Sequence, residues 1–119
     1  MSTAITSAKI TGPHVLCPNL KIAVYKIAFP TSWTAAGVAL DLSNEFDYVT
    51  SYLFGCSGAI ADHGYRFNLI GTYSADGMAA AGLSVVAHWS AASAAALDDV
   101  DNSTNLSGVN DIYLTVFGN

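Results

Sequence analysis

The sequence predicts an all-β fold, an antiparallel β-sandwich or jelly roll of about six to eight strands with an N-terminal arm. Apolar and polar residues alternate through several short runs, turn signals rich in Gly, Asn and Asp separate those runs, and no strand-helix-strand rhythm is present. A length of 119 residues suits one hydrophobic core. Together these observations favour a single sandwich over a parallel α/β sheet.

Longer alternating runs are expected as the main strands, and shorter runs are expected beside them. The longer runs are 20–29, 47–55, 65–71, 82–90 and 111–118, and the shorter ones lie near 8–11, 38–42, 57–61 and 72–75. Because every second residue of a strand points the same way, alternation assigns these sets to common faces: Tyr48, Thr50, Tyr52 and Phe54; Tyr65, Phe67 and Leu69; Leu83, Val85, Ala87 and Trp89; Ile112, Leu114 and Val116.

Turn signals separate the expected strands. They lie at 55–58, 61–64, 74–77 and 105–111. The Ala-rich stretch 91–97 is expected as a loop or one short helical turn. The wider tract 77–97 is long enough for a membrane span, but its serines, its alanines and His88 make it only weakly hydrophobic, so no span is expected.

The first 19 residues differ in character from the rest, being rich in Ser, Thr and small residues. If extended, they would reach on the order of 60 Å and could touch neighbouring molecules. A frayed terminus is the alternative, and the sequence leaves both open. The expected organisation is an N-terminal arm over 1–19 and a single β-sandwich domain over 20–119.

The charge content limits the classes of partner. The net charge is −5, with four basic residues, and charged residues make up 11% of the chain, against a usual share of about 25%. Phosphate backbones and anionic membranes are bound by clusters of Lys and Arg, and no such cluster is present. We therefore expect no direct nucleic-acid or membrane binding, and a charge-poor surface that faces another protein.

No group of residues predicts catalysis, a cofactor or a metal. The acidic stretch 98–105 places Asp99, Asp101 and Ser103 in alternation like calcium ligands, but it lacks the Gly and the final Glu of the calcium-binding loop. A solvated acidic loop is expected there. Cys17 and Cys56 show no metal spacing, and no export signal precedes them, so they are expected as reduced, partly buried thiols of a protein that folds in a cytoplasm.

The segment "PTSWTAAGVALDLSNEF", residues 30–46, carries large apolar side chains where a polar connection is expected. Pro30 ends the preceding strand, and Trp33 lies in a loop of small and polar residues before Gly37. Two roles for Trp33 are open, a cap over one end of the sandwich core or an exposed anchor for a partner.

The same segment carries a resemblance to a known family. A strand, Pro30, a small polar loop, Gly37, the sequence "ALDLS" and Phe46, followed by a Tyr/Val strand and a terminal "LTVFG" strand, resemble small structural proteins of tailed bacteriophages. That family includes the capsid decoration or cement proteins, and the resemblance covers roughly residues 22–118.

The resemblance implies a non-enzymatic sandwich or jelly-roll protein, made in a bacterial cytoplasm, that binds the outer surface of the major capsid shell as a dimer or trimer. Val38 to Ser43 would form a core strand and turn. The residues expected to contact the major capsid protein or another subunit are Ile5, Ile10, Val15, Trp33, Asp98, Asp99 and Asp101. The alternative is a glycan- or receptor-binding virion module, in which Trp33, Trp89 and the tyrosines line a groove. A small enzyme on a β scaffold has no positive support in the sequence.

Overall fold

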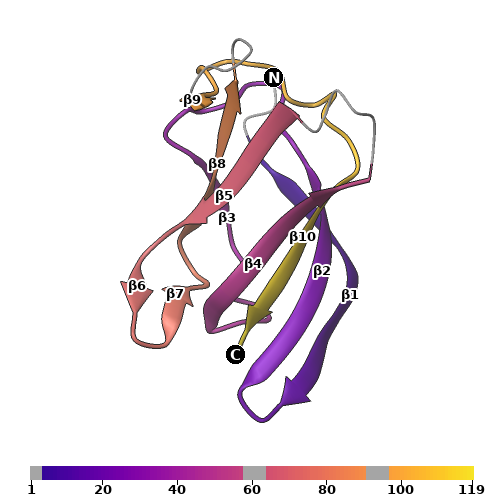
Figure 1. Ribbon diagram of the computed structural model, residues 1–119, viewed down its shortest axis with the longest axis vertical. Helices are drawn as coiled ribbons and strands as arrows, with labels where there is room; N and C mark the ends of the chain where they lie inside the picture. The colour runs from indigo at the N-terminus through magenta and orange to yellow at the C-terminus, as the bar shows by residue number, and fades with distance from the viewer. Residues whose placement is uncertain (1–3, 58–63, 91–96) are drawn as a thin grey trace.

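The computed structural model is a two-layer β-sandwich, which confirms the all-β prediction (Figure 1). It describes residues 4–57, 64–90 and 97–119. The strands of this described part are β1 (Thr6–Cys17), β2 (Leu20–Ala28), β3 (Val38–Leu40), β4 (Tyr48–Cys56), β5 (Tyr65–Ile70), β6 (Tyr73–Ser74), β7 (Gly77–Ala79), β8 (Leu83–Ser90), β9 (Leu97–Asp99) and β10 (Ile112–Gly118). Their pairings are antiparallel. The finer jelly-roll connectivity stays a prediction.

The strands form a larger and a smaller sheet. The larger has six strands in the order β1-β2-β10-β4-β7-β6, and the smaller has the order β3-β8-β5, with β9 also paired to β8. The C-terminal strand β10 lies between β2 and β4 (Figure 1). The expected strand near 57–61 and the expected loop 91–97 fall mostly outside the described residues.

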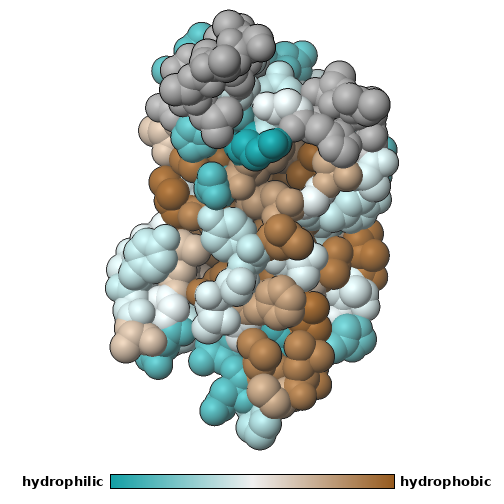
Figure 2. Space-filling model, in the orientation of Figure 1, coloured by the Kyte–Doolittle hydropathy of each residue, from teal (hydrophilic) through white to brown (hydrophobic). Residues whose placement is uncertain are grey.

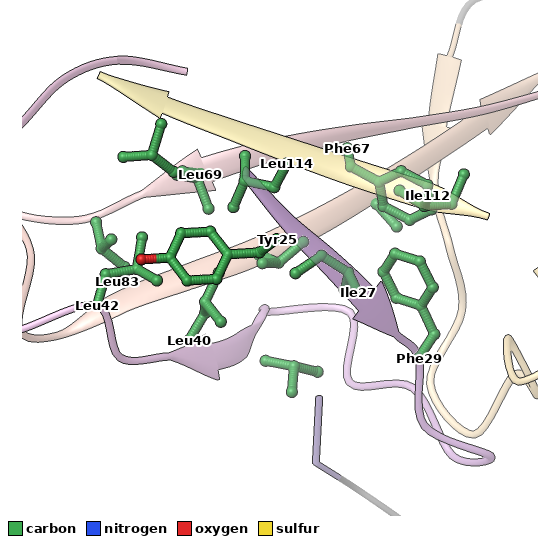
Figure 3. Close-up of a cluster of buried hydrophobic side chains, with 14 of the residues drawn as sticks. Tyr25, Ile27, Phe29, Leu40, Leu42, Phe67, Leu69, Leu83, Ile112 and Leu114 are labelled. Atoms are coloured by element: carbon green, nitrogen blue, oxygen red, sulfur yellow. The ribbon is translucent and has the colours of Figure 1, made fainter. Parts of the chain in front are cut away.

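The core fills the space between the two sheets and follows the predicted alternation closely. In β10, Ile112, Leu114 and Val116 are buried, and in β5 the buried residues are Phe67 and Leu69. Figure 3 shows side chains from β2, β5 and β10 meeting between the layers, with the rings of Phe29 and Phe67 close together. Those two rings are stacked, with centroids 4.5 Å apart. None of the described polar or charged residues is fully buried, so apolar packing dominates this core.

Strand β1 lies within the expected N-terminal arm. It pairs with β2 from Thr6 opposite Ala28 to Cys17 opposite Leu20, with three irregularities in register. This part of the arm therefore lies along the sheet as an edge strand rather than projecting from it. Its residues are almost all exposed, which explains why no apolar alternation marks it in the sequence.

The predicted face of β4 is wrong at its start. The register passes from Ser51 opposite Phe117 to Val49 opposite Gly118, so Thr50 is an extra residue in a β-bulge. A one-residue shift exchanges the two faces of a strand. Val49 is therefore buried, and Tyr48 and Thr50 do not share the face of Tyr52 and Phe54. The turn signal expected at 55–58 is also wrong at its first residues, since β4 continues to Cys56.

The segment 30–46 forms one end of the core. Its Trp33 is 1% exposed, and β3 and the following turn bury Val38, Leu40 and Leu42. The loop around residue 104 holds the tryptophan backbone, because the Trp33 amide donates to the Thr104 carbonyl at 2.9 Å and the Trp33 carbonyl accepts from the Ser103 amide at 2.7 Å. The apolar character of this segment is therefore explained by burial.

Candidate protein-binding face

The outward side of the larger sheet is the main candidate surface. Since Ala23, Tyr25 and Ile27 of β2 are buried, alternation turns the residues between them outward. Cross-strand register then aligns further outward side chains from β10, β4 and β1. We define the outer face as Ile22, Val24 and Lys26 of β2, Tyr113, Thr115 and Phe117 of β10, and Leu53 of β4.

This outer face is apolar and nearly uncharged. Leu53 is 65% exposed, and its row continues across the sheet through Thr115 and Val24 to Thr11. The next row contains Phe117 and Ile22. In Figure 2, brown residues gather over β2, β10 and the lower part of the β1–β2 hairpin.

The one charged residue of the outer face as defined is already paired. The Lys26 ammonium lies 3.1 Å from the Asp111 carboxylate, and this contact raises the Lys26 pKa through the hydrogen bond and the opposite charge. The pair lies at the end of the face, where β10 begins. The rows through Leu53 and Phe117 present apolar and hydroxyl groups, together with the His14 imidazole at the β1 end of the second row.

Strand β1 forms the rim of the larger sheet. Its register places Thr11 and His14 in the outward rows through Val24 and Ile22, while Val15 lies opposite Lys21 on the inner side. Ile10, Val15 and Leu16 are each more than half exposed, and Ile5 is half-buried and packs against the core. Of the expected contact residues in the N-terminal stretch, Ile10 and Val15 are thus exposed on β1, but Val15 does not share the outer face.

The other expected contact residues lie elsewhere. Trp33 is buried in the core. Its burial favours the role of a cap over that of an exposed anchor. Asp98 and Asp99 belong to strand β9, where they are opposite Trp89 and His88, and this strand replaces the start of the expected acidic loop. Asp101 is exposed after β9. The three acidic residues are thus grouped at the smaller sheet and are not joined to Ile10 and Val15.

A polar cluster lies at the inner side of the β1–β2 hairpin. Lys9 of β1 is 3.5 Å from the Glu45 carboxylate, and the Lys21 ammonium donates to the Glu45 carbonyl at 2.6 Å. Burial, reinforced by the negative charge of Glu45, raises the pKa of Tyr25 to about 12. These contacts tie β1 and β2 to the turn after β3. A small cleft of about 140 Å³ adjoins the cluster and is lined by Ser7, Lys9, Tyr25, Asp41, Leu42, Asn44 and Glu45.

Metal and thiol chemistry find little support in the part of the chain that is described. No group of three or more His, Cys, Asp or Glu side chains there could hold a metal ion. Both cysteines are free, but Cys17 is exposed, which corrects the expectation of partial burial, while Cys56 is half-buried. No helix in the described ranges has the length and hydrophobicity needed to cross a bilayer.

The groove expected for glycan binding is not formed as the sequence suggested. Trp33 is buried and Trp89 is 39% exposed, while Tyr52 and Tyr65 line a cleft between β4 and β5.

Sequence reasoning missed the outer face itself. Its signal was the run 20–28, in which both alternating sets of side chains are largely apolar.

Comparison of the chain with protein-family models, with curated proteins and with solved structures gives no match.

Proposed function

We propose that this chain is a non-enzymatic structural protein that binds the surface of a larger protein assembly through its outer face. The observation that carries the proposal is the row of Leu53, Thr115 and Val24 across β4, β10 and β2, in which Leu53 is 65% exposed and Thr115 and Val24 are half-buried. Contiguous exposed apolar patches on soluble domains mark sites of protein interaction.

The composition supports the same role. Interface cores are depleted in charge and enriched in aromatic residues, and the outer face holds Tyr113 and Phe117 with one ion-paired lysine. A sheet face also suits binding to a broad, flat partner, because its side chains are held by two neighbouring strands.

The resemblance to phage structural proteins gives the proposal its partner. We propose that the assembly is the capsid of a tailed bacteriophage, that the major capsid protein is bound on its outer surface, and that the chain acts as a decoration protein in a dimer or trimer. Its place would then be the virion, after synthesis in the bacterial cytoplasm. The glycan-binding alternative stays a prediction from the sequence.

Co-sedimentation with expanded, decoration-free capsids tests this function. Saturable binding that raises the temperature at which the shells rupture is expected for the natural chain. Leu53→Glu places a charge at the most exposed apolar position of the outer face and should weaken binding by about tenfold or more, since burying an unpaired charge is unfavourable.

Ile70→Glu is the matched control, because Ile70 is 43% exposed on β5 of the smaller sheet. It should bind as the natural chain does. Equal loss in both variants would show that the outer face has no special role. A folded natural chain that never sediments with shells would refute the capsid assignment.

A further inference from the structure

A cleft of about 420 Å³ separates strands β4 and β5, at the seam between the two sheets. The two strands run beside each other in Figure 1. The cleft is lined by Tyr52, Leu53, Phe54, Gly55 and Cys56 of β4, by Tyr65, Arg66, Phe67 and Asn68 of β5, and by Ile112 of β10. The lining is therefore formed mainly by two consecutive stretches of strand, so main-chain atoms of both strands border it.

Each of these strands has a sheet edge without a second strand. β4 pairs with β10 along its length, but its other edge meets β7 only at Tyr48 and Val49. β5 pairs with β8 on one side and is the last strand of the smaller sheet on the other. Within the described residues, the edge of β4 from Thr50 to Cys56 has no strand partner. Unpaired amide and carbonyl groups of this kind are a template for an added strand.

The edge of β1 provides an informative contrast. There the register is interrupted three times, and the strand contains Pro13, which lacks an amide donor. Bulges and prolines protect edge strands from unwanted pairing. Between Leu53 and Cys56, β4 contains no proline and keeps a regular register with β10. The β4 edge is thus open to pairing, whereas the β1 edge is guarded against it.

The side chains of the cleft suit an extended peptide. Phe54 and Phe67 have ring centroids 5.8 Å apart, and Tyr65 stacks on Phe67 at 6.2 Å. These rings pack against one another and form part of the lining of the cleft. An alternating strand can place every second apolar side chain against such a wall.

Two residues of the lining also make contacts or surfaces outside it. The Arg66 guanidinium donates to the Tyr65 carbonyl at 3.2 Å. Leu53 contributes to both the cleft and the outer face, so one partner could engage both surfaces.

We propose that this cleft binds an extended, apolar segment of a partner protein, and that the segment pairs with the edge of β4 from Leu53 to Cys56. The site goes beyond the proposed function, since it does not require that the partner be a capsid. The Tyr52 hydroxyl, which donates to Asn68 Oδ1 at 3.1 Å, closes one part of the cleft.

The test starts with displayed random peptides about twelve residues long, selected for binding to the full chain. The enriched peptide is synthesised, and its affinity is measured by fluorescence anisotropy. Cys56 lines the cleft and Cys17 is exposed on β1, which offers a matched pair of blocking sites. The Cys17→Ser chain is capped at Cys56 with a maleimide, and the Cys56→Ser chain is capped at Cys17.

The Cys56 cap is expected to weaken peptide binding by about tenfold or more, and the Cys17 cap to leave it within about twofold. Methylation of alternate peptide amides should also abolish binding, because strand addition depends on main-chain hydrogen bonds. Hydrogen exchange on the unmodified chain gives an independent readout, since the peptide should slow exchange at amides of 53–56. Failure to enrich any peptide, binding that survives the Cys56 cap, or unchanged exchange at 53–56 would each overturn the proposal.

Discussion

Replacement of Trp33 by Ala tests whether this residue caps the core. Its side chain is 1% exposed and meets Phe29 edge to face, with ring centroids 6.1 Å apart. Truncation of a buried tryptophan removes apolar contacts and leaves a cavity, which lowers the free energy of unfolding by about 3–5 kcal/mol. Whole domains are stable by about 5–15 kcal/mol, so Trp33→Ala should remove a large part of the total.

Urea unfolding followed by circular dichroism measures this loss. With a slope of about 2 kcal/mol per molar urea, the midpoint should fall by about 2 M. Trp33→Phe should lose much less, because it keeps an aromatic ring and removes an indole N–H that has no hydrogen-bond partner among the described residues. Trp89→Ala is the control, since Trp89 is 39% exposed, and it should stay within about 1 kcal/mol of the natural chain.

The result that would refute this reasoning is a loss for Trp33→Ala no larger than that for Trp89→Ala. Trp33 would then be outside the core and available as an anchor for a partner. Fluorescence gives a second check, because the chain has two tryptophans and Trp89→Ala leaves Trp33 as the only emitter. Its emission should be blue-shifted in the folded state and should move to longer wavelength on unfolding.

Two further stability predictions follow from the same core. Gly77→Ala should lower the free energy of unfolding by about 1–3 kcal/mol, because Gly77 has φ of +119° and an added Cβ would lie 2.7 Å from the Val49 carbonyl oxygen. Gly108→Ala is the control in thermal unfolding, because an added Cβ at Gly108 meets open space. Equal melting temperatures for the two variants would contradict the expectation. Burial raises the pKa of Tyr25 from 10.0 to about 12, so the unfolded chain releases this proton first and stability should fall as the pH rises from about 10 to about 12. Tyr25→Phe should flatten that fall in urea titrations, and an unchanged profile would exclude Tyr25 as its source.

Alternation predicted the strands whose two faces differ in burial. β5 and β10 have one face in the core and one toward solvent, so Phe67, Leu69 and Leu114 could be assigned to the core from the sequence. Of β1, only a short strand near 8–11 could be predicted, because both faces of β1 are largely exposed and no apolar set recurs along its full length. The bulge at Thr50 was equally hidden, since an extra residue changes the phase without changing the composition.

The candidate surfaces depend on what sequence patterns leave unspecified. The outer face arises because β10, the last strand of the chain, lies between β2 and β4 and so brings Tyr113 and Phe117 beside Val24 and Leu53. The cleft arises because β4 and β5, although consecutive, belong to different sheets. Strand order sets both features, and alternation within a strand does not encode it. The burial of Trp33 likewise required the loop at 103–104, which is remote in sequence.

The placement of charge gives the low charged fraction a structural meaning. Asp41, Asp47, Asp76, Asp101 and Asp111 all lie in connections between strands, and the Asp41 carboxylate accepts from the Ser43 amide at 2.8 Å as part of a turn. A shortage of charge spread evenly over the surface would leave no distinct face. Here Lys9, Lys21 and Arg66 lie on strands but outside the outer face as defined, and Asp98 and Asp99 lie in β9 of the smaller sheet. The rows of the outer face through Leu53 and Phe117 contain apolar and hydroxyl side chains, with His14 at the β1 end of the second row. A protein partner can desolvate such a surface at a small cost in free energy.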